Sequence, residues 1–380
     1  MWLNFQVEGK SCEMNFDLGE KEKALKEKVK GLFDADAMAS LSRLEKEGVP
    51  ELRKTLPIWL KRLARVGYLA LDMDKGKNSV PLVVAQESLA SISPILFLSV
   101  EMNARLFGRL LAVYGSWRQR EEILNPLTEG RIIGTVALSE DEADRKGARE
   151  GYLISGKVQH VINAPVADWM AIPVRENGSV GICLIEKGGK GLSIGEGLQA
   201  IGYNGVAALI SLDHCPVPSE FYIGPFEGID PLGPLRMWED QILTVASLGL
   251  MQRSFDTALG FSKTHVREGK PLIAHQEFGF KLAEMLTLLQ TSQLLAYRAA
   301  WMAETDDREV TVLTHCAKVF CSESAEKVAS YALQILGKEG FFQKNPAGEG
   351  YGEAKYLQIG GTGTEFSRMK IGDILLEYDK

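Results

Sequence analysis

Residues 235–266 read LRMWEDQILTVASLGLMQRSFDTALGFSKTHV, and their pattern sets the architecture of the C-terminal part. Apolar residues recur there at i, i+3, i+4 and i+7, which predicts one long helix. Three further helical segments follow over 272–303, 308–336 and 364–377. Long helices joined by short loops are typical of a bundle. We therefore expect residues 226–380 to form a C-terminal four-helix bundle domain.

Upstream of this bundle, residues 131–225 change to short apolar runs separated by Gly, Asn and Asp. The runs are IIGTVALSE, GYLISGKVQHVI, DWMAIPVR, VGICLIE and AALISLDHCPV. Short strands at even spacing with turn residues between them predict a sandwich or barrel. The glycines of GGKGLSIGEG carry no dinucleotide fingerprint, because that motif requires a strand before it and a helix after it. We expect a middle β-barrel domain.

The N-terminal part, residues 1–130, reads as successive amphipathic helices. They are EKEKALKEKVKGLF, VPELRKTLPIWLKRLARVG, VPLVVAQESLASI and ILFLSVEMNARLFGRLLAVYG. Gly67, Gly115 and Gly130 mark helix ends. The domain order is thus α, β, α, and the fold class is mainly α with a β-barrel.

Composition narrows the class of protein. A chain of 380 residues is too long for one ordinary core, and 45% hydrophobic with 24% charged residues is a globular composition. The net charge of -7 argues against a nucleic-acid-binding protein.

Five scattered cysteines suggest neither a disulfide framework nor a zinc site. His315, Cys316 and Cys321 share a helix and are expected to pack in the core. The sequence predicts a cytoplasmic protein with no membrane span and no metal.

Four local runs, in this order of domains, resemble the acyl-CoA dehydrogenase superfamily. They are QAIGYNGVAALISLDHCPVPSEFYIG, then GLMQRSFDTALGFSK with AHQEFGFKLAEM, then QILGKEGF, then AKYLQIGGTGTEFSRMKIGDILL. The resemblance implies FAD as cofactor, removal of a proton next to the thioester carbonyl, and hydride transfer from the next carbon to flavin N5. It also implies electron-transfer flavoprotein as acceptor and a tetramer of two dimers.

The residues at two positions together predict the catalytic base. Many members of the family carry a Glu in a Tyr-Glu-Gly-Thr run before the last helix, and here Gly361 stands at that position. The isovaleryl and long-chain types instead carry a Glu ten residues before the Gly of Gly-Leu-x-Gln, and ten residues before Gly249 is Glu239. We expect Glu239 to be the general base and Gly361 to line the substrate site. The alternative is that Glu239 and Asp240 only complement a helix N-terminus.

A second carboxylate, Glu101, lies inside the apolar run ILFLSVEMNARLFG, where the family's acyl chamber has its floor. There it would disfavour a long plain alkyl chain, because an unpaired buried charge is costly. Short, branched, cyclic or polar acyl groups would then be preferred. The alternative is a carboxylate paired with Arg105 at i, i+4.

The flavin motifs are altered. Where the family has its Thr-Glu-Pro run, this sequence reads Ala137, Leu138, Ser139 and Glu140 without the Pro, and where the family has Trp-Ile-Thr it reads His160, Val161, Ile162 and Asn163. Ser139 keeps the hydroxyl, and His160 either stacks in place of the Trp or is an ordinary strand residue. For the rest of the cofactor, the resemblance assigns Arg267, Gln334, Gly337, Lys338 and Glu365, although Lys338 replaces a glycine.

Three functions follow from these observations. The first is an FAD-dependent acyl-CoA dehydrogenase, an oxidoreductase of fatty, aromatic or alicyclic acid degradation that acts on CH–CH groups. The second is one chain of a heteromeric dehydrogenase whose flavin site is incomplete. The third is an acyl-CoA-binding relative with non-oxidative chemistry.

Overall fold

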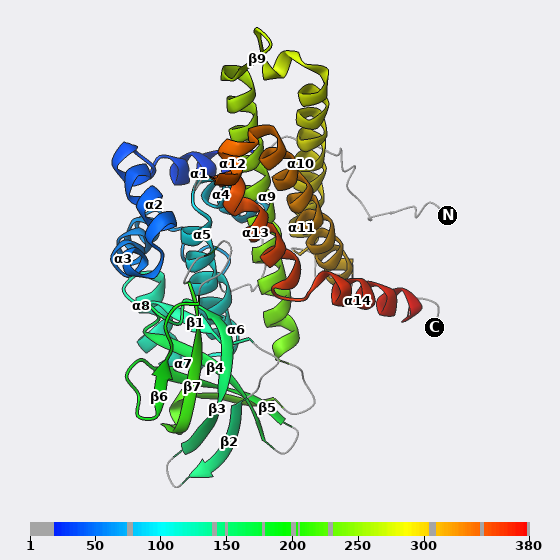
Figure 1. Ribbon diagram of the computed structural model, residues 1–380. Coiled ribbons are helices and arrows are strands. Elements are labelled where there is room, and N and C mark those ends of the chain that lie inside the picture. The colour runs from blue at the N-terminus through cyan, green and yellow to red at the C-terminus, as the bar shows by residue number, and fades with distance from the viewer. Residues whose placement is uncertain are drawn as a thin grey trace.

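The computed structural model describes residues 19–73, 79–138, 143–148, 151–176, 179–198, 203, 206–226, 231–303, 309–342 and 346–377. The predicted order of helices, strands and helices along the chain is confirmed. In Figure 1 the β-sheet lies at one end of the molecule, beneath the N-terminal helices and the helices of the C-terminal part.

The N-terminal part is helical throughout its described residues. Its elements are α1 (Glu20–Lys30), α2 (Ala35–Glu47), α3 (Val49–Arg65), α4 (Val80–Ile92), α5 (Pro94–Glu101), the π-helix η1 (Met102–Gly108), α6 (Arg109–Tyr114), α7 (Trp117–Gln119), the π-helix η2 (Arg120–Leu124) and α8 (Asn125–Thr128). The sequence analysis missed α2. Its start carries a clear signal, because the side chain of Asp34 accepts a hydrogen bond from Ala37 N at 2.8 Å as an N-cap.

The middle part is a single eight-stranded sheet. Its strands are β1 (Gly134–Val136), β2 (Ala143–Ala148), β3 (Gly151–Ile162), β4 (Trp169–Glu176), β5 (Ser179–Glu186), β6 (Leu192–Ile194), β7 (Ala207–Val217) and β8 (Tyr222–Phe226), with η3 (Ser219–Phe221) before β8. They pair in the order β6-β7-β3-β2-β4-β5-β8, and β1 joins β4 in parallel. The sheet contacts η1 through β1, and Asn163, directly after β3, bonds to Ser99 on α5.

The C-terminal part holds three long helices and three shorter ones. They are α9 (Leu232–Thr264), α10 (Gln276–Ala303), α11 (Glu309–Leu336), α12 (Lys338–Phe342), α13 (Pro346–Ile359) and α14 (Thr364–Glu377), with β9 (Val266–Arg267), β10 (Lys270–Pro271) and η4 (Leu272–Ala274) between α9 and α10. The sequence analysis missed α13, whose glycines disfavour a helix. One of these glycines, Gly350, has a steric reason to be glycine, since a Cβ there would lie 2.9 Å from Leu250 Cδ1 on α9.

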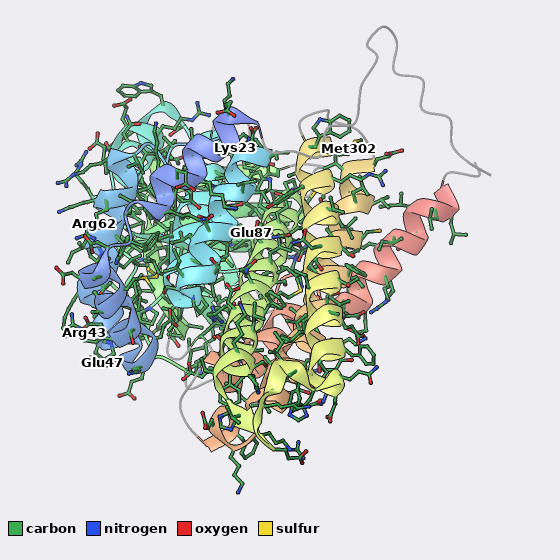
Figure 2. The ribbon with its side chains drawn as sticks, turned by 90° about the horizontal axis from the view of Figure 1, so that it is seen from above. Lys23, Arg43, Glu47, Arg62, Glu87 and Met302 are labelled. Atoms are coloured by element: carbon green, nitrogen blue, oxygen red, sulfur yellow. The ribbon has the colours of Figure 1, made fainter. Side chains whose placement is uncertain are left out.

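Close packing joins the N-terminal helices to the bundle. A Cβ at Gly249 of α9 would lie 2.4 Å from Ala90 Cβ on α4, so the two helices meet at a glycine. Beside this contact, the buried carboxylate of Glu87 on α4 accepts hydrogen bonds from Gln293 and Tyr297 of α10. Figure 2 shows Glu87 between the two groups of helices. None of the described helices is long and apolar enough to cross a membrane.

Candidate active site

Glu239 lies in the first part of α9 and is the more accessible of two adjacent carboxylates. Its side chain is partly accessible, whereas the next residue, Asp240, is fully buried. Within the described part of the chain the Glu239 carboxylate accepts no hydrogen bond. Burial raises the pKa of Glu239 to about 7, the negative charge of Asp240 adds to the rise, and Arg236 and Lys318 oppose it. A carboxyl group with such a pKa suits proton transfer near neutral pH.

Asp240 is held by the protein instead. Its Oδ1 accepts a hydrogen bond from Thr362 N at 2.7 Å, and its Oδ2 lies 3.9 Å from Nδ1 of buried His315. Burial raises the pKa of Asp240 to about 6, and Lys318 and the bond from Thr362 limit that rise. Burial also lowers the pKa of His315 to about 4, which leaves its imidazole neutral at pH 7. Asp240 is therefore an anchored anion.

A buried lysine from α11 completes this cluster. Lys318 is fully buried, and its Nζ donates hydrogen bonds to the carbonyl oxygens of Leu357 at 2.6 Å and Gly360 at 3.0 Å. These carbonyls end α13, where a helix carries partial negative charge. Burial lowers the pKa of Lys318, and Asp240 and Glu239 oppose this shift. Lys318 thus joins α11 to the turn that follows α13.

That turn contains Gly361 and lies against α9. Gly361 has φ +62, and a Cβ on it would lie 2.5 Å from Oδ1 of Asp240. A Cβ on the preceding Gly360 would lie 3.2 Å from the ring of Tyr356, whose pKa is raised by burial and by the charge of Glu239. Position 361 therefore lies against Asp240, the residue that follows Glu239, and the pairing of Glu239 with Gly361 stays a prediction.

Glu101 sits in a closed polar network. It is fully buried at the end of α5 and accepts hydrogen bonds from Tyr68 Oη at 2.6 Å and Gln86 Nε2 at 2.5 Å. Arg105 Nε lies 3.7 Å away, and its guanidinium also donates to the carbonyls of Tyr68 and Leu69. The ion pair with Arg105, the alternative raised from the sequence, is thus present. A contact between Glu101 and substrate stays a prediction.

The residues predicted to hold the flavin ring lie around the inner end of β3. Leu138 follows β1 and is half-buried, Val161 is buried, and His160 is exposed with φ +58 at a bulge in the pairing of β3 with β7. Ser139 lies outside the described residues. Their roles stay predictions.

This junction contains buried polar atoms without partners. Among the described residues, Ser99 Oγ, Asn103 Nδ2 and Asn163 Oδ1 have no hydrogen-bond partner. The other groups of the same residues bind locally: Asn163 Nδ2 donates to Ser99 O at 2.8 Å, and Asn103 Oδ1 accepts from Gly134 N at 2.7 Å. Unsatisfied buried polar atoms call for a ligand or water. The donors and acceptors here fit the polar edge of a flavin ring.

The remaining predicted cofactor residues lie elsewhere. Gln334, Gly337 and Lys338 are exposed at the far end of α11, and Gln334 is about 24 Å along the helix from Lys318 at 1.5 Å per residue. Arg267 is exposed in β9, at the tip of the α9–α10 connection (Figure 1). Glu365 is exposed in the first turn of α14, where its own backbone N–H and Thr364 lower its pKa. This chain therefore does not gather all predicted cofactor residues at Glu239.

Sequence reasoning missed four members of the cluster, namely Asp240 as an anchor, His315, Lys318 and Tyr356. A signal existed for one of them, because Lys318 is the only formally charged residue in the helical run LTHCAKVFC. His315 was expected in the core, and it is buried. Cys183, Cys215, Cys316 and Cys321 are free thiols, and no group of three or more metal-binding side chains occurs in the described part of the chain.

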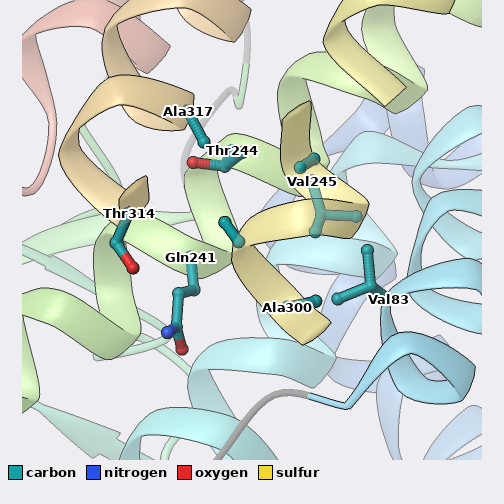
Figure 3. Close-up of a pocket in the computed structure, with 9 residues that line it drawn as sticks. Val83, Gln241, Thr244, Val245, Ala300, Thr314 and Ala317 are labelled. Carbon is teal, nitrogen blue, oxygen red and sulfur yellow. The ribbon is translucent and has the colours of Figure 1, made fainter. Parts of the chain in front are cut away.

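A separate cavity lies on the other side of α9. It is lined by Val83, Gln241, Thr244, Val245, Ala296, Ala299, Ala300, Thr314 and Ala317. Gln241 and Thr314 point toward this space in Figure 3. The small side chains of its four alanines create this space. Neither Glu239 nor Asp240 lines it.

Comparisons with known proteins agree with this architecture. Residues 238–376 match the family described as "Acyl-CoA dehydrogenase, C-terminal domain". The mitochondrial isovaleryl-CoA dehydrogenase of Oryza sativa subsp. japonica is 30% identical over 314 residues, 78% of this chain and 76% of that protein. The butyryl-CoA dehydrogenase structure from Megasphaera elsdenii aligns with a TM-score of 0.85 at 21% identity, over 96% of this chain and 100% of that one. A glutaryl-CoA dehydrogenase from Mycobacterium smegmatis in complex with FADH2 aligns with a TM-score of 0.82 at 18% identity, over 94% and 95%.

Proposed function

Because the chain belongs to the acyl-CoA dehydrogenase family, we propose that it is an FAD-dependent enzyme that desaturates a short, branched, cyclic or polar acyl-CoA. In this reaction a proton leaves the carbon next to the thioester carbonyl and a hydride leaves the following carbon. The product is the 2-enoyl thioester. Glu239 is the residue that accepts the proton.

One observation supports this choice of base above all. Glu239 on α9 is a partly accessible carboxylate with a pKa of about 7 and no hydrogen bond from the described residues, and its charge acts on Tyr356, whose ring lies against the Gly360–Gly361 turn. The neighbouring Asp240 is fully buried and bonded to Thr362. General-base assistance of this kind accelerates a reaction about 10²–10⁴-fold.

The turn beside Glu239 supplies a second element of the mechanism. Among the described residues, the backbone N–H of Gly361 has no acceptor. We assign this N–H to the thioester oxygen, where it stabilises the negative charge that develops as the proton leaves. Leu243 and the ring of Tyr356 pack against this turn and give it apolar surroundings.

FAD would lie against the junction of β3 with α5 and η1, held by Leu138, His160 and Val161. When bound, it supplies an acceptor for the hydride. The unpartnered polar atoms of Ser99, Asn103 and Asn163 support a polar heterocycle at this junction. Electron-transfer flavoprotein is the proposed acceptor from the reduced enzyme.

The proposed substrate class rests on buried charge near the site. Glu101, Arg105 and Arg109 are all fully buried along α5, η1 and α6, and the first two of these elements pack against α9. Polar and charged side chains offer a long alkyl chain less apolar contact than aliphatic side chains would. The relatives reported above are named for isovaleryl-CoA, butyryl-CoA and glutaryl-CoA, which are short thioesters.

The test is anaerobic bleaching of the purified yellow protein by a panel of isovaleryl-, butyryl-, glutaryl- and palmitoyl-CoA. We expect at least one short thioester to bleach the flavin, and Glu239→Gln to slow that step by about 10²-fold or more. Glu277→Gln, an exposed carboxylate on α10, is the matched control and should behave like the parent. Unchanged bleaching in Glu239→Gln would remove the assignment.

A heteromeric enzyme is the second candidate. It is favoured by Lys338, an exposed side chain where the family has a glycine against the cofactor. A chain that purifies colourless with added FAD, and gains colour only with a related chain, would support this candidate. A yellow homo-oligomer would support the first.

A further inference from the structure

Asp240 and Gly361 fit each other sterically. The direction in which a side chain would leave Gly361 is filled by Oδ1 of Asp240, 2.5 Å from the ideal Cβ position. Real Cβ contacts do not come that close, so a side chain at 361 and the present position of Asp240 exclude each other. The φ of +62 adds a preference for glycine.

The same carboxylate holds the turn through its backbone. Oδ1 of Asp240 accepts the Thr362 N–H at 2.7 Å, directly after Gly361. On the other side of the turn, Lys318 Nζ binds the carbonyls of Leu357 and Gly360. All these groups are buried or half-buried, where hydrogen bonds to charged groups are stronger than those between neutral groups. One anion and one cation therefore hold residues 357–362 from two helices.

We propose that Asp240 and Lys318 form a clamp that positions the 360–362 turn beside Glu239, and that Gly361 is glycine because the clamp occupies its side-chain space. Asp240 is a positioning residue and not the base. Its link to catalysis rests on the proposed function, since the clamp fixes the Gly361 N–H next to Glu239. The clamp itself is independent of that function.

The position of Asp240 argues against a second base. A base must reach the substrate, and Asp240 is 0% exposed, with one oxygen bonded to Thr362 and the other facing buried His315.

The charged and titratable groups that face Glu239 and Asp240 come from four helices. They are Arg236 on α9, His315 and Lys318 on α11, Tyr356 on α13 and Lys370 on α14.

The first test measures the turn without any substrate. Hydrogen–deuterium exchange of the peptide covering 354–366 should accelerate about tenfold or more at the Thr362 amide in Asp240→Ala, because one charged hydrogen bond is lost. Asp240→Asn keeps an oxygen acceptor and should retain most of the protection. Equal exchange in the parent and in a folded Asp240→Ala would overturn the clamp. If Asp240→Ala does not fold, Asp240→Ser serves as the shortened variant.

The second test isolates the steric effect of Asp240 on a side chain at position 361. Gly361→Ala should lower Tm in the parent by more than it does in the Asp240→Ala background. The strain of φ +62 is the same in both backgrounds, whereas the contact with Oδ1 exists only in the parent. Equal decreases in the two backgrounds would contradict the exclusion of a side chain by Asp240.

The third test separates the clamp from the base. In Asp240→Asn, loss of the negative neighbour should shift the midpoint of the pH–rate profile for flavin reduction to lower pH, with the half-saturating substrate concentration nearly unchanged. A merely structural Asp240 would lower Tm and leave the midpoint in place, which would overturn the positioning role. If Glu239→Gln reduces flavin normally while the exchange and Tm results hold, the proposed base fails and the clamp stands.

Discussion

The carboxyl group of Glu239 has a pKa of about 7, against an ordinary value of 4.5. The folded protein therefore holds this proton to higher pH than the unfolded chain does. Stability is then greatest below the unfolded value and falls as pH rises through the interval up to about 7. A base that is ready to accept a proton from substrate thus destabilises the fold at neutral and alkaline pH.

We predict that Glu239→Gln raises the free energy of unfolding at about pH 8 by about 1–3 kcal/mol and changes it little at about pH 5, since one pKa unit corresponds to about 1.4 kcal/mol. The lower part of this range allows for solvent at the accessible side of Glu239. Urea unfolding at both pH values measures the difference. Glu277→Gln, on the exposed face of α10, should show no such pH dependence. An equal effect at both pH values would contradict the raised pKa.

The sequence predicted this site from the absence of a Glu at 361 and the presence of one at 239, and in the structure Gly361 lies against Asp240, the next residue. From the sequence, Asp240 had no predicted role beyond complementing the start of a helix. Adjacent helical residues point about 100° apart, so one carboxylate lies at the accessible side and the other faces the turn. Which one does so depends on the rotation of α9 in the bundle. Periodicity alone does not fix that rotation.

At the scale of helices and strands, amphipathic pattern predicted the long elements well. The third bundle helix was expected over 308–336 and α11 runs from Glu309 to Leu336. The pattern failed at α13, where Gly348, Gly350 and Gly352 lower helix propensity. Packing against α9 outweighs this low helix propensity. Gly350 lies so close to α9 that a side chain there would press on Leu250. Such a contact joins segments far apart in the chain and leaves no local signal.

Two glycines of α9 form a matched pair for testing helix packing. Gly249→Ala should lower Tm clearly, because its Cβ would lie 2.4 Å from Ala90 Cβ and 2.5 Å from its carbonyl carbon on α4. Gly260→Ala should stabilise by about 0.5–1 kcal/mol, since nothing lies within 4 Å of its Cβ and alanine favours a helix. Thermal unfolding of both variants gives the comparison. Similar effects of the two substitutions would contradict the close approach of α4 and α9.

Lys318 connects α11, α13 and α9, so we expect its replacement to weaken the packing of all three helices. Lys318→Met removes two hydrogen bonds to carbonyls and leaves Asp240 without its cation. We predict a loss of about 3–5 kcal/mol in the free energy of unfolding, since two hydrogen bonds from a charged group, each worth about 1.5–3 kcal/mol, are removed. Lys327→Met on the same helix is the control, because its pair with Glu284 is exposed and such pairs contribute about 0–1 kcal/mol. A loss in Lys318→Met no larger than in the control would refute the connection.

At the scale of the whole molecule, apolar side chains remain on the outside of the bundle. Phe280, Leu294 and Trp301 on α10 are 65%, 53% and 48% exposed and lie two heptads and one heptad apart, hence on one face. On α14, which projects from the body in Figure 1, Phe366, Met369 and Leu376 are 60%, 62% and 71% exposed. Apolar surface on this scale marks protein–protein contacts. We infer that these faces bind another copy of the chain, as in the tetramer that the resemblance implies.

This inference also explains why predicted cofactor residues stand far from Glu239. Gln334, Lys338 and Arg267 are exposed and lie far from Glu239 in their own chain, and in such an assembly a neighbouring copy would bring them to another chain's cofactor. We predict that Leu294→Glu combined with Trp301→Glu yields smaller particles in sedimentation velocity and retains less FAD after gel filtration, because each site then loses its neighbour. Trp117→Glu is the control, since Trp117 is 78% exposed on α7 and lies on the N-terminal domain. Smaller particles that keep their full FAD would assign the whole cofactor site to one chain, and particles of parental size would refute the role of α10 in assembly.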